Sequence, residues 1–230
     1  MLSNLKTPEA ILFDWDNTLA DNWNLIINSL NATFVKYGLE TWSREEADFK
    51  VNKSARDLFP EIFGDKSDEA TKYFYDYFEN NHLNELELFP ETKLLIECLF
   101  ETDIPLGIVS NKRGDLLRRE VEHIQLKPFF KAIVGANDAP RDKPFRDPLD
   151  FTLNKMNISP MSENDIGKRV LWYVGDGHTD LEAANNAYFQ PIIINTPRGT
   201  FDKTLVNNNE NLYFFESLRE FYLYCTKKSF

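Results

Sequence analysis

The amino-acid sequence predicts an α/β protein whose core is a Rossmann-like, doubly wound parallel sheet and which carries an inserted α-helical cap domain. Short apolar runs alternate with helical patterns in the second half of the chain, as they do in folds with a parallel sheet. A similar apolar run, residues 10–13, precedes a region without a convincing strand, residues 22–87. The 230 residues, 42% of them hydrophobic, are sufficient for one large domain with a smaller insert.

Helical spacing dominates the insert. Apolar side chains recur at helical intervals over residues 23–37, and Gly38 ends the pattern as a residue just after a helix does. Ser43, followed three residues later by Glu46, matches a capping box that opens a second helix. Residues 67–83 predict a long helix with aromatic side chains along one side. We therefore expect this part of the chain to be helical throughout.

Strands and helices alternate in the rest of the chain. The predicted strands are residues 10–13, 104–109, 132–134, 170–174 and 192–194. The predicted helices are residues 91–101, 114–123, 148–156 and 178–187. Residues 214–224 predict an aromatic-rich amphipathic helix, which we expect to dock on the core rather than on a membrane because it carries few basic residues. The alternation predicts right-handed crossovers with helices on both faces of the sheet.

Composition disfavours several classes of protein. A formal net charge of −11 disfavours binding to a nucleic-acid backbone through a broad basic surface. Residues 1–9 lack the apolar core of a signal peptide, and no apolar stretch approaches the roughly 20 residues of a membrane span. Cys98 and Cys225 are too few for a disulfide framework or a zinc site, and we expect both in the core. A cytoplasmic monomer or homodimer without membrane or nucleic-acid partners is therefore expected.

Two aspartates follow the first predicted strand with one residue between them. Side chains at positions i and i+2 of an extended chain point to the same side, so Asp14 and Asp16 would face one site, roughly 6–7 Å apart. That separation suits a phosphate and a hard cation between the carboxylates. The same stretch is explained equally well as a strand end capped by turn-forming residues, Asn17 among them. The other strand ends must decide between these interpretations.

Three further polar clusters follow the later strands or lie in the loops between them. They are Ser110-Asn111-Lys112, Asp142-Lys143-Pro144 and the segment from Gly175 to Asp180, which contains Asp176. A parallel sheet places these loops along one edge together with Asp14 and Asp16. Four carboxylates at one point repel one another and need cations, for which Lys143 and a divalent metal are candidates; an all-oxygen site favours Mg²⁺. Such a site suits phosphoryl transfer, in which a carboxylate can be the nucleophile.

In this order, the clusters resemble the four motifs of the haloacid dehalogenase superfamily of phosphohydrolases. The matching segments are Asp14-Trp15-Asp16-Asn17-Thr18-Leu19, Ser110-Asn111-Lys112, Lys143-Pro144 and Gly175-Asp176 through Asp180. The helical insert resembles the family's small α-helical cap, and residues 88–90 resemble its hinge. This resemblance implies a catalytic core of residues 1–18 and 89–230 with a cap of residues 19–88. Residues 135–148 resemble the phosphoglycolate-phosphatase-like branch.

The resemblance implies a role for each matched residue. Asp14 would attack phosphorus, and Asp16 would protonate the leaving oxygen and then activate the water that hydrolyses the acyl phosphate. The implied substrate-binding residues are Ser110, Asn111, Lys143 and Thr18. The implied ligands of Mg²⁺ are Asp14, Asp16 through its backbone carbonyl, Asp176 and, in a supporting position, Asp180. The residues expected to carry catalysis are Asp14, Asp16, Ser110 and Lys143.

Two positions refine the implied activity. The family usually has glycine where Asn17 stands, and asparagine tolerates the left-handed backbone conformation better than other non-glycine residues. Asp16 favours a phosphatase over a dehalogenase, because a phosphate ester needs an acid for its leaving group. We therefore predict a Mg²⁺-dependent phosphatase of a small phosphomonoester that works through an aspartyl-phosphate. A phosphomutase, or a non-catalytic binding or regulatory protein on the same scaffold, is the alternative.

The cap carries no recognisable specificity motif. Arg56, just before Leu58, is the first candidate for a substrate contact, although a solvated surface arginine explains it more simply. Lys53, Ser54 and Trp15 are weaker candidates of the same kind. Because the cap interrupts a regular alternation and has aromatic positions of its own, we expect it to move as a unit against the core. Those positions are Phe34, Tyr73, Phe74 and Phe78.

Overall fold

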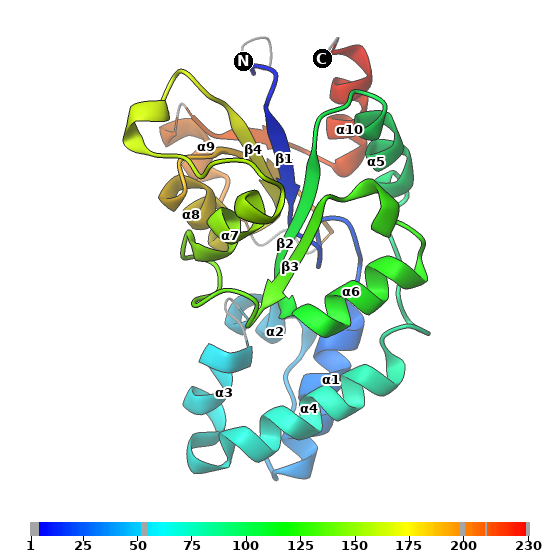
Figure 1. The fold of residues 1–230 in the computed structure, drawn as a ribbon. Helices are drawn as coiled ribbons and strands as arrows, with labels where there is room; N and C mark the ends of the chain where they lie inside the picture. Colours follow the sequence, from blue (N-terminus) through cyan, green and yellow to red (C-terminus); the bar gives the residue numbers. More distant parts are fainter. Residues whose placement is uncertain (1–4, 52–54, 198–200, 210, 229–230) are drawn as a thin grey trace.

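The computed structural model describes residues 5–51, 55–197, 201–209 and 211–228 (Figure 1). An α/β body with a central sheet lies at one end of the molecule, and a group of helices from the segment after the first strand lies at the other. The two ends of the described chain both lie on the side of the body remote from these helices.

The sheet has six strands, all parallel, in the order β3-β2-β1-β4-β5-β6. Their bounds are Ala10–Phe13 for β1, Leu106–Arg113 for β2, Ala132–Ala136 for β3, Leu171–Gly175 for β4, Gln190–Ile194 for β5 and Tyr213–Phe215 for β6. The four side chains of β1 are fully buried, as in a strand that helices cover on both faces. The chain winds outward from β1 in both directions, which confirms the predicted doubly wound sheet.

The register of the three central strands determines where the polar loops begin. Phe13 of β1 lies opposite Ile108 of β2 and Val174 of β4. The residues that follow each of them therefore leave the sheet at the same edge, at the point where the direction of winding reverses. Ligands of open α/β sheets bind at this switch point, so the strand order itself brings the polar clusters together.

Helices cover both faces of the sheet (Figure 1). One face packs against α5 (Thr92–Phe100), α6 (Gly114–His123) and α10 (Leu218–Lys227), and the other against α7 (Asp147–Lys155) and α8 (His178–Asn186). Each face has its own cluster of buried apolar side chains. The bounds predicted for α5 to α8 differ from the observed ones by at most one residue.

The end of the chain departs from the prediction. One helix over residues 214–224 is wrong at its start, because Tyr213–Phe215, which follow the short α9 (Thr204–Asn208), form β6 and pair with β5. Aromatic side chains fit the pleated surface of a sheet, so pairing overrides the helical pattern here. The helix α10 begins later, where the Ser217 hydroxyl accepts a hydrogen bond from the N–H of Glu220 at 3.1 Å. It docks on α5, as expected.

The described chain between β1 and α5 is helical. Its helices are α1 (Trp23–Lys36), α2 (Arg44–Lys50), α3 (Ala55–Phe63) and α4 (Ser67–Asn81), with a 3₁₀ turn at Gly64–Lys66. Within the described part of this segment, β structure is limited to isolated bridges. The two linkers to the body run side by side: Ala20 bridges to Leu88, and the N–H of Asp21 donates to the carbonyl of Glu87 at 2.8 Å.

A third apolar cluster lies among the helices of this segment, separate from the two clusters of the sheet. Three of the four predicted aromatic positions belong to it: Phe34, Phe74 and Phe78. Tyr73 does not, because it is only half-buried and lies beneath the ammonium of Lys36, 5.3 Å from the ring centroid. Leu116 of α6 joins the cluster from the body. Ser43 and Glu46 form the predicted capping box at the start of α2.

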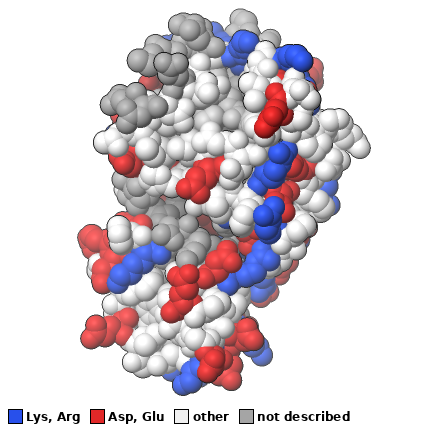
Figure 2. Space-filling view, turned by 90° about the vertical axis from the view of Figure 1, so that its left-hand side faces the viewer, with Lys and Arg blue, Asp and Glu red and all other residues white. Residues whose placement is uncertain are grey.

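None of the helices in the described ranges is long and apolar enough to cross a lipid bilayer. Basic and acidic side chains are interspersed over the face drawn in Figure 2, which is hollowed between the α/β body and the helical segment. Cys225 is buried and Cys98 partly buried, and both are free thiols.

Candidate active site

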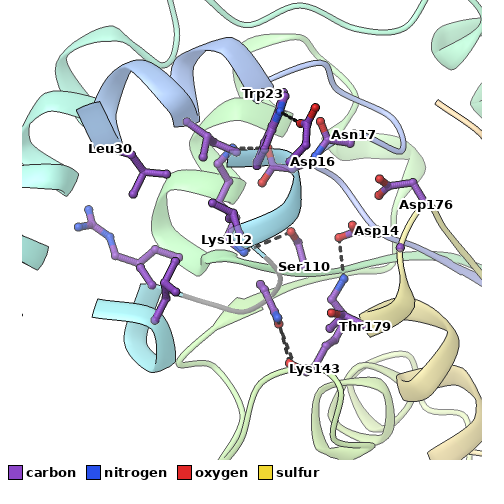
Figure 3. Close-up of a pocket in the computed structure, with 18 of the residues that line it drawn as sticks. Asp14, Asp16, Asn17, Trp23, Leu30, Ser110, Lys112, Lys143, Asp176 and Thr179 are labelled. Carbon is purple, nitrogen blue, oxygen red and sulfur yellow. Dashed lines mark hydrogen bonds and ion pairs between the residues drawn. The ribbon is translucent and has the colours of Figure 1, made fainter. Parts of the chain in front are cut away.

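A cavity of about 680 Å³ lies between the carboxyl edge of the sheet and the helical segment (Figure 3). Every polar cluster noted in the sequence contributes to its lining. These residues are Asp14, Asp16, Asn17, Ser110, Asn111, Lys112, Lys143, Asp176 and Asp180. Apolar side chains of the helical segment line the cavity as well: Trp23, Leu30, Phe59 and Phe78. The structure thus brings the predicted residues to one place, while their chemical roles stay predictions.

Asp14 and Lys143 lie at the centre of this site. The ammonium of Lys143 is 2.8 Å from Oδ1 of Asp14 (Figure 3). It is also 2.7 Å from Oδ1 of Asp180. Burial raises the pKa of Asp14 to about 7, although the ammonium of Lys143 opposes the shift; the nearby Asp180 adds to it. Burial by itself would lower the pKa of Lys143, but the two carboxylates raise it well above its usual value. The lysine therefore stays charged, and one ammonium does not balance the carboxylates around it.

Asn111 holds the backbone of Lys143. Its Nδ2 donates a hydrogen bond to the carbonyl of Lys143 at 2.9 Å, and its Oδ1 accepts one from the N–H of Lys143 at 2.9 Å. Both polar ends of the amide are engaged, so in this structure Asn111 positions the lysine. Ser110 accepts a hydrogen bond from the N–H of Lys112 at 3.2 Å, which leaves its own hydroxyl hydrogen for an anion in the cavity.

Three carboxylates form a candidate metal site. Asp14, Asp176 and Asp180 each offer one oxygen, and these oxygens lie within 4.8 Å of one another. Oδ2 of Asp180 accepts hydrogen bonds from the N–H groups of Asp176 and Gly177 at 3.1 and 3.0 Å, and its Oδ1 faces the ammonium described above. Both oxygens of Asp180 are therefore engaged, which suits a supporting position. The all-oxygen donor set and its excess of negative charge fit a hard divalent cation.

Two residues shape the turn after Asp16. Asn17 has a φ of +63°, the left-handed conformation that the sequence predicts for it, and it lines the cavity. Thr18 is fully buried, and its hydroxyl donates a hydrogen bond to Oδ1 of Asp176 at 3.2 Å. Thr18 thus contacts the candidate metal site from behind, and a contact between Thr18 and a substrate stays a prediction.

Arg56 of α3 lies outside the lining of the cavity. Its guanidinium forms an ion pair with the buried carboxylate of Asp142, to which its Nε donates a hydrogen bond at 3.0 Å. This pair connects the helical segment to the loop that carries Lys143. A substrate contact of Arg56 stays a prediction, and Lys53 and Ser54 lie outside the described residues.

The carboxylate of Asp16 lies outside the acidic cluster and faces Lys112. The ammonium of Lys112 donates to Oδ1 of Asp16 at 2.7 Å, and Nδ2 of Asn22 donates to the same oxygen at 2.8 Å. Sequence reasoning missed both partners, as well as the carboxylate of Glu120 behind them. A signal was present, because Glu120 lies three residues after Leu117 on the apolar side of α6, where a charge needs partners.

The fold and this arrangement of carboxylates and lysine at its switch point are those of a phosphohydrolase. The family model described as haloacid dehalogenase-like hydrolase matches residues 11–194, and the chain belongs to this family. The match contains all four of the polar clusters that carry the resemblance in the sequence.

Curated relatives are named as phosphatases and pyrophosphatases. The pyrophosphatase PpaX of Oceanobacillus iheyensis is 31% identical over 182 residues, which cover 79% of this chain and 80% of the relative. PpaX of Listeria monocytogenes is 28% identical over 179 residues, 77% of this chain and 79% of the relative. The phosphoglycolate phosphatase of Photorhabdus laumondii is 25% identical over 191 residues, 80% of this chain and 78% of the relative.

Solved structures share the fold. A haloacid dehalogenase-like family hydrolase of Streptococcus pneumoniae superposes with a TM-score of 0.74 at 22% identity, covering 91% of this chain and 95% of that one. CbbY of Rhodobacter sphaeroides, solved in complex with phosphate, has a TM-score of 0.70 at 20% identity, with 82% and 86% covered. At these identities the likeness shows the fold alone.

Proposed function

We propose that the protein is a Mg²⁺-dependent phosphatase that hydrolyses a small phosphomonoester through an aspartyl-phosphate on Asp14. The observation that carries this proposal is the buried Asp14 carboxylate, 2.8 Å from the Lys143 ammonium at the switch point of the sheet. A nucleophilic carboxylate beside a fixed cation suits attack on a phosphoryl group, because the lysine can offset the charge of the group in transfer. The names of the curated relatives support the same chemistry.

In the first step, an oxygen of Asp14 forms a bond to phosphorus while the bond from phosphorus to the leaving oxygen breaks. Asp16 gives its proton to that leaving oxygen, so the alcohol departs neutral. Ser110 and Lys143 would hold the phosphoryl oxygens during the transfer. Oδ1 of Asp16 already accepts two hydrogen bonds, so we assign the exchanging proton to its Oδ2.

In the second step, Asp16 is a carboxylate and takes a proton from the water that attacks phosphorus. The bond between phosphorus and the Asp14 oxygen breaks, and inorganic phosphate leaves. Both aspartates return to their starting forms, and the two steps add up to the hydrolysis of one ester by one water. Asn111 would serve both steps by fixing the position of Lys143.

The acidic cluster would hold the Mg²⁺. Asp14, Asp176 and the backbone carbonyl of Asp16 would bind it, and Asp180 and Thr18 would support them. The oxygen donors and the surplus of negative charge at this point favour such an ion. When bound, the cation would supply positive charge for the phosphoryl group.

We further propose that residues 19–88 form a cap on a catalytic core of residues 1–18 and 89–230. The side-by-side linkers and the separate apolar cluster of the helices support this division. Paired linkers suit a hinge, since they change direction together. Such a cap would keep water from the acyl phosphate until the leaving group departs, and would contact that group.

Pyrophosphate is a second candidate substrate, favoured by the names of several curated relatives. The same two steps would split a phosphoanhydride, because phosphate would then be the leaving group that Asp16 protonates.

A panel of small phosphomonoesters and pyrophosphate, assayed with Mg²⁺ for release of phosphate, tests the proposal. We expect turnover of at least one compound by the wild-type protein and none by Asp14→Asn. Absence of phosphate release over the whole panel would overturn the proposed function.

A further inference from the structure

Glu120 of α6 is a fully buried carboxylate with four partners from separate parts of the chain. Its Oε2 accepts hydrogen bonds from Nε1 of Trp15 at 2.7 Å and from Nδ2 of Asn22 at 3.2 Å. The same oxygen lies 2.9 Å from the ammonium of Lys112. Its Oε1 lies 2.9 Å from Nδ1 of His82, a side chain that is also fully buried.

A charge in the interior destabilises the fold unless it is matched. Burial by itself would raise the pKa of Glu120, but the Lys112 ammonium, helped by hydrogen-bond donors, brings it below its usual value. Glu120 is therefore ionised, and Lys112 is its counter-charge. The ammonium is shared between two carboxylates, because it also lies 2.7 Å from Oδ1 of Asp16.

The partners of Glu120 lie next to Asp16 and at the two ends of the helical segment. Trp15 directly precedes Asp16 in the turn after β1. Asn22 directly precedes α1 and His82 directly follows α4, so the two residues mark the two ends of the helical segment. Asn22 also donates to Asp16. Glu120 thus contacts both ends of the segment and the groups that hold the Asp16 carboxylate.

We propose that Glu120 is a positioning residue that orients the carboxyl group of Asp16 toward the leaving group. Through Glu120, this orientation also depends on where the helical segment lies. Lys112 carries the effect, because its ammonium is held between the two carboxylates. The inference rests on the proposed function, since it takes Asp16 as the group that exchanges a proton with the leaving oxygen. The polar partners of Glu120 among the described residues do not include Ser110 or Lys143, so Glu120 acts on the leaving-group side of the site.

A buried ion pair that only stabilised the fold would behave differently. Breaking it would lower kcat/KM for every substrate by the same factor, because it would lower the fraction of folded enzyme. Misplacement of the general acid would instead slow some substrates more than others. A nitrophenolate leaves readily without a proton, whereas an alkoxide needs one. The dependence of the rate on the leaving group therefore separates the two roles.

The test compares para-nitrophenyl phosphate with alkyl phosphates as substrates of Glu120→Gln, which keeps the shape of the side chain and removes its charge. We expect kcat/KM for the alkyl esters to fall at least about tenfold more than for the aryl ester. Equal losses on both classes would overturn the inference and leave the proposed function standing. A wild-type protein that is inactive on every ester would overturn the proposed function, and this inference with it.

Two further variants complete the design. Glu122→Gln is the matched control, because Glu122 lies on the same helix, is exposed and pairs only at the surface with Lys127, at 2.9 Å; we expect no change in either rate. Trp15→Phe keeps an aromatic ring and removes one hydrogen bond to Glu120, so it replaces Glu120→Gln if that variant fails to fold. The same selective loss is expected from it, and an unselective loss would overturn the inference. The Tm of each variant reports folding independently of the rates.

Discussion

The hydroxyl of Thr18 donates a hydrogen bond to Oδ1 of Asp176 at 3.2 Å; both side chains are buried, and the two residues are 158 positions apart in the sequence. This bond joins the turn after β1 to the loop after β4. The carboxylate of Asp176 is thereby oriented by the same turn that follows Asp14. The geometry of the candidate metal site therefore depends on two adjacent strands. A substitution at Thr18 should change the affinity for the metal although Thr18 is not itself a proposed ligand.

Thr18→Val tests this relationship, because valine keeps the shape of the side chain and removes the hydroxyl. We expect the dissociation constant of Mg²⁺ to rise about tenfold, as removal of a group that orients a metal ligand does. Titration calorimetry measures it directly. Thr33→Val is the matched control, since Thr33 is equally buried and its hydroxyl donates to the carbonyl of Ser29 at 2.8 Å. An unchanged dissociation constant in Thr18→Val would argue against Asp176 as a ligand.

Removal of the metal should abolish activity. The ammonium of Lys143 pairs with two carboxylates of the cluster, those of Asp14 and Asp180, and the three carboxylates repel one another when the metal is gone. We expect chelation by EDTA to stop phosphate release and added Mg²⁺ to restore it. Ca²⁺ should substitute poorly, because its looser coordination misplaces the attacking oxygen. Full activity after dialysis against EDTA contradicts a role for the metal.

Asp14→Asn should lose turnover by at least about a thousandfold, because an amide cannot form the acyl phosphate. The fold should survive, since asparagine has the same shape and carries no charge to repel the neighbouring carboxylates. Phosphate release and circular dichroism measure the two effects. Asp150→Asn on α7 is the control, because Asp150 is partly buried and pairs with Arg146, at 2.6 Å, away from the site. Activity within tenfold of wild type would remove Asp14 as the nucleophile.

The stabilising effect of Glu120 should depend on pH in a defined direction. The pKa of Glu120 is lowered in the folded protein, so the unfolded chain binds the proton more readily. The stabilisation is therefore complete above about pH 5, where glutamate is ionised in the unfolded chain as well, and is lost as the pH falls through the folded value. Urea unfolding of wild type and Glu120→Gln should show a constant difference in free energy near neutral pH that shrinks in acid. A difference in unfolding free energy that grows as the pH falls would contradict the lowered pKa of Glu120.

The fold was largely predictable from the sequence because its main signals are local. The run of β1 is apolar because helices cover it on both sides, and the amphipathic pattern of α6 can be recognised without any other part of the chain. The strand β6 was missed because three residues at a sheet edge have no period, and only pairing with β5 makes them a strand. Tyr73 was wrongly expected in the apolar cluster of the helices, because the spacing of aromatic residues along a helix does not determine which ring faces solvent.

Only the site residues at the carboxyl ends of the strands could be predicted from the sequence. Parallel strands end together, so Asp14, Ser110 and Asp176 had to meet wherever the helices lie. The partners of Asp16 could not be found in this way. Lys112 of β2 pairs with Asp16, and Glu120 reaches Lys112 only through the packing of α6 against β2, a distance that no spacing in the sequence measures.

Arg56 and Asp142 offer the remaining test, because they join the helical segment to the loop before Lys143. The Arg56 side chain is 41% exposed, whereas that of Asp142 is 3% exposed. Because the guanidinium is partly exposed to water, the pair can bias the placement of the segment without locking it. If this is its role, the two residues act as one unit; if Arg56 instead reaches the substrate, it acts alone.

Arg56→Ala and Asp142→Asn should therefore raise KM by similar factors, each below about fivefold, and the double variant should be no worse than either single one. The same factors should appear with every phosphate ester, because the pair acts through the position of the helices and not through the leaving group. Steady-state kinetics of the three variants on two unrelated esters measure this. An effect of Arg56→Ala that exceeds that of Asp142→Asn and differs between the esters contradicts the coupling, and supports a direct substrate contact for Arg56 as the sequence predicts.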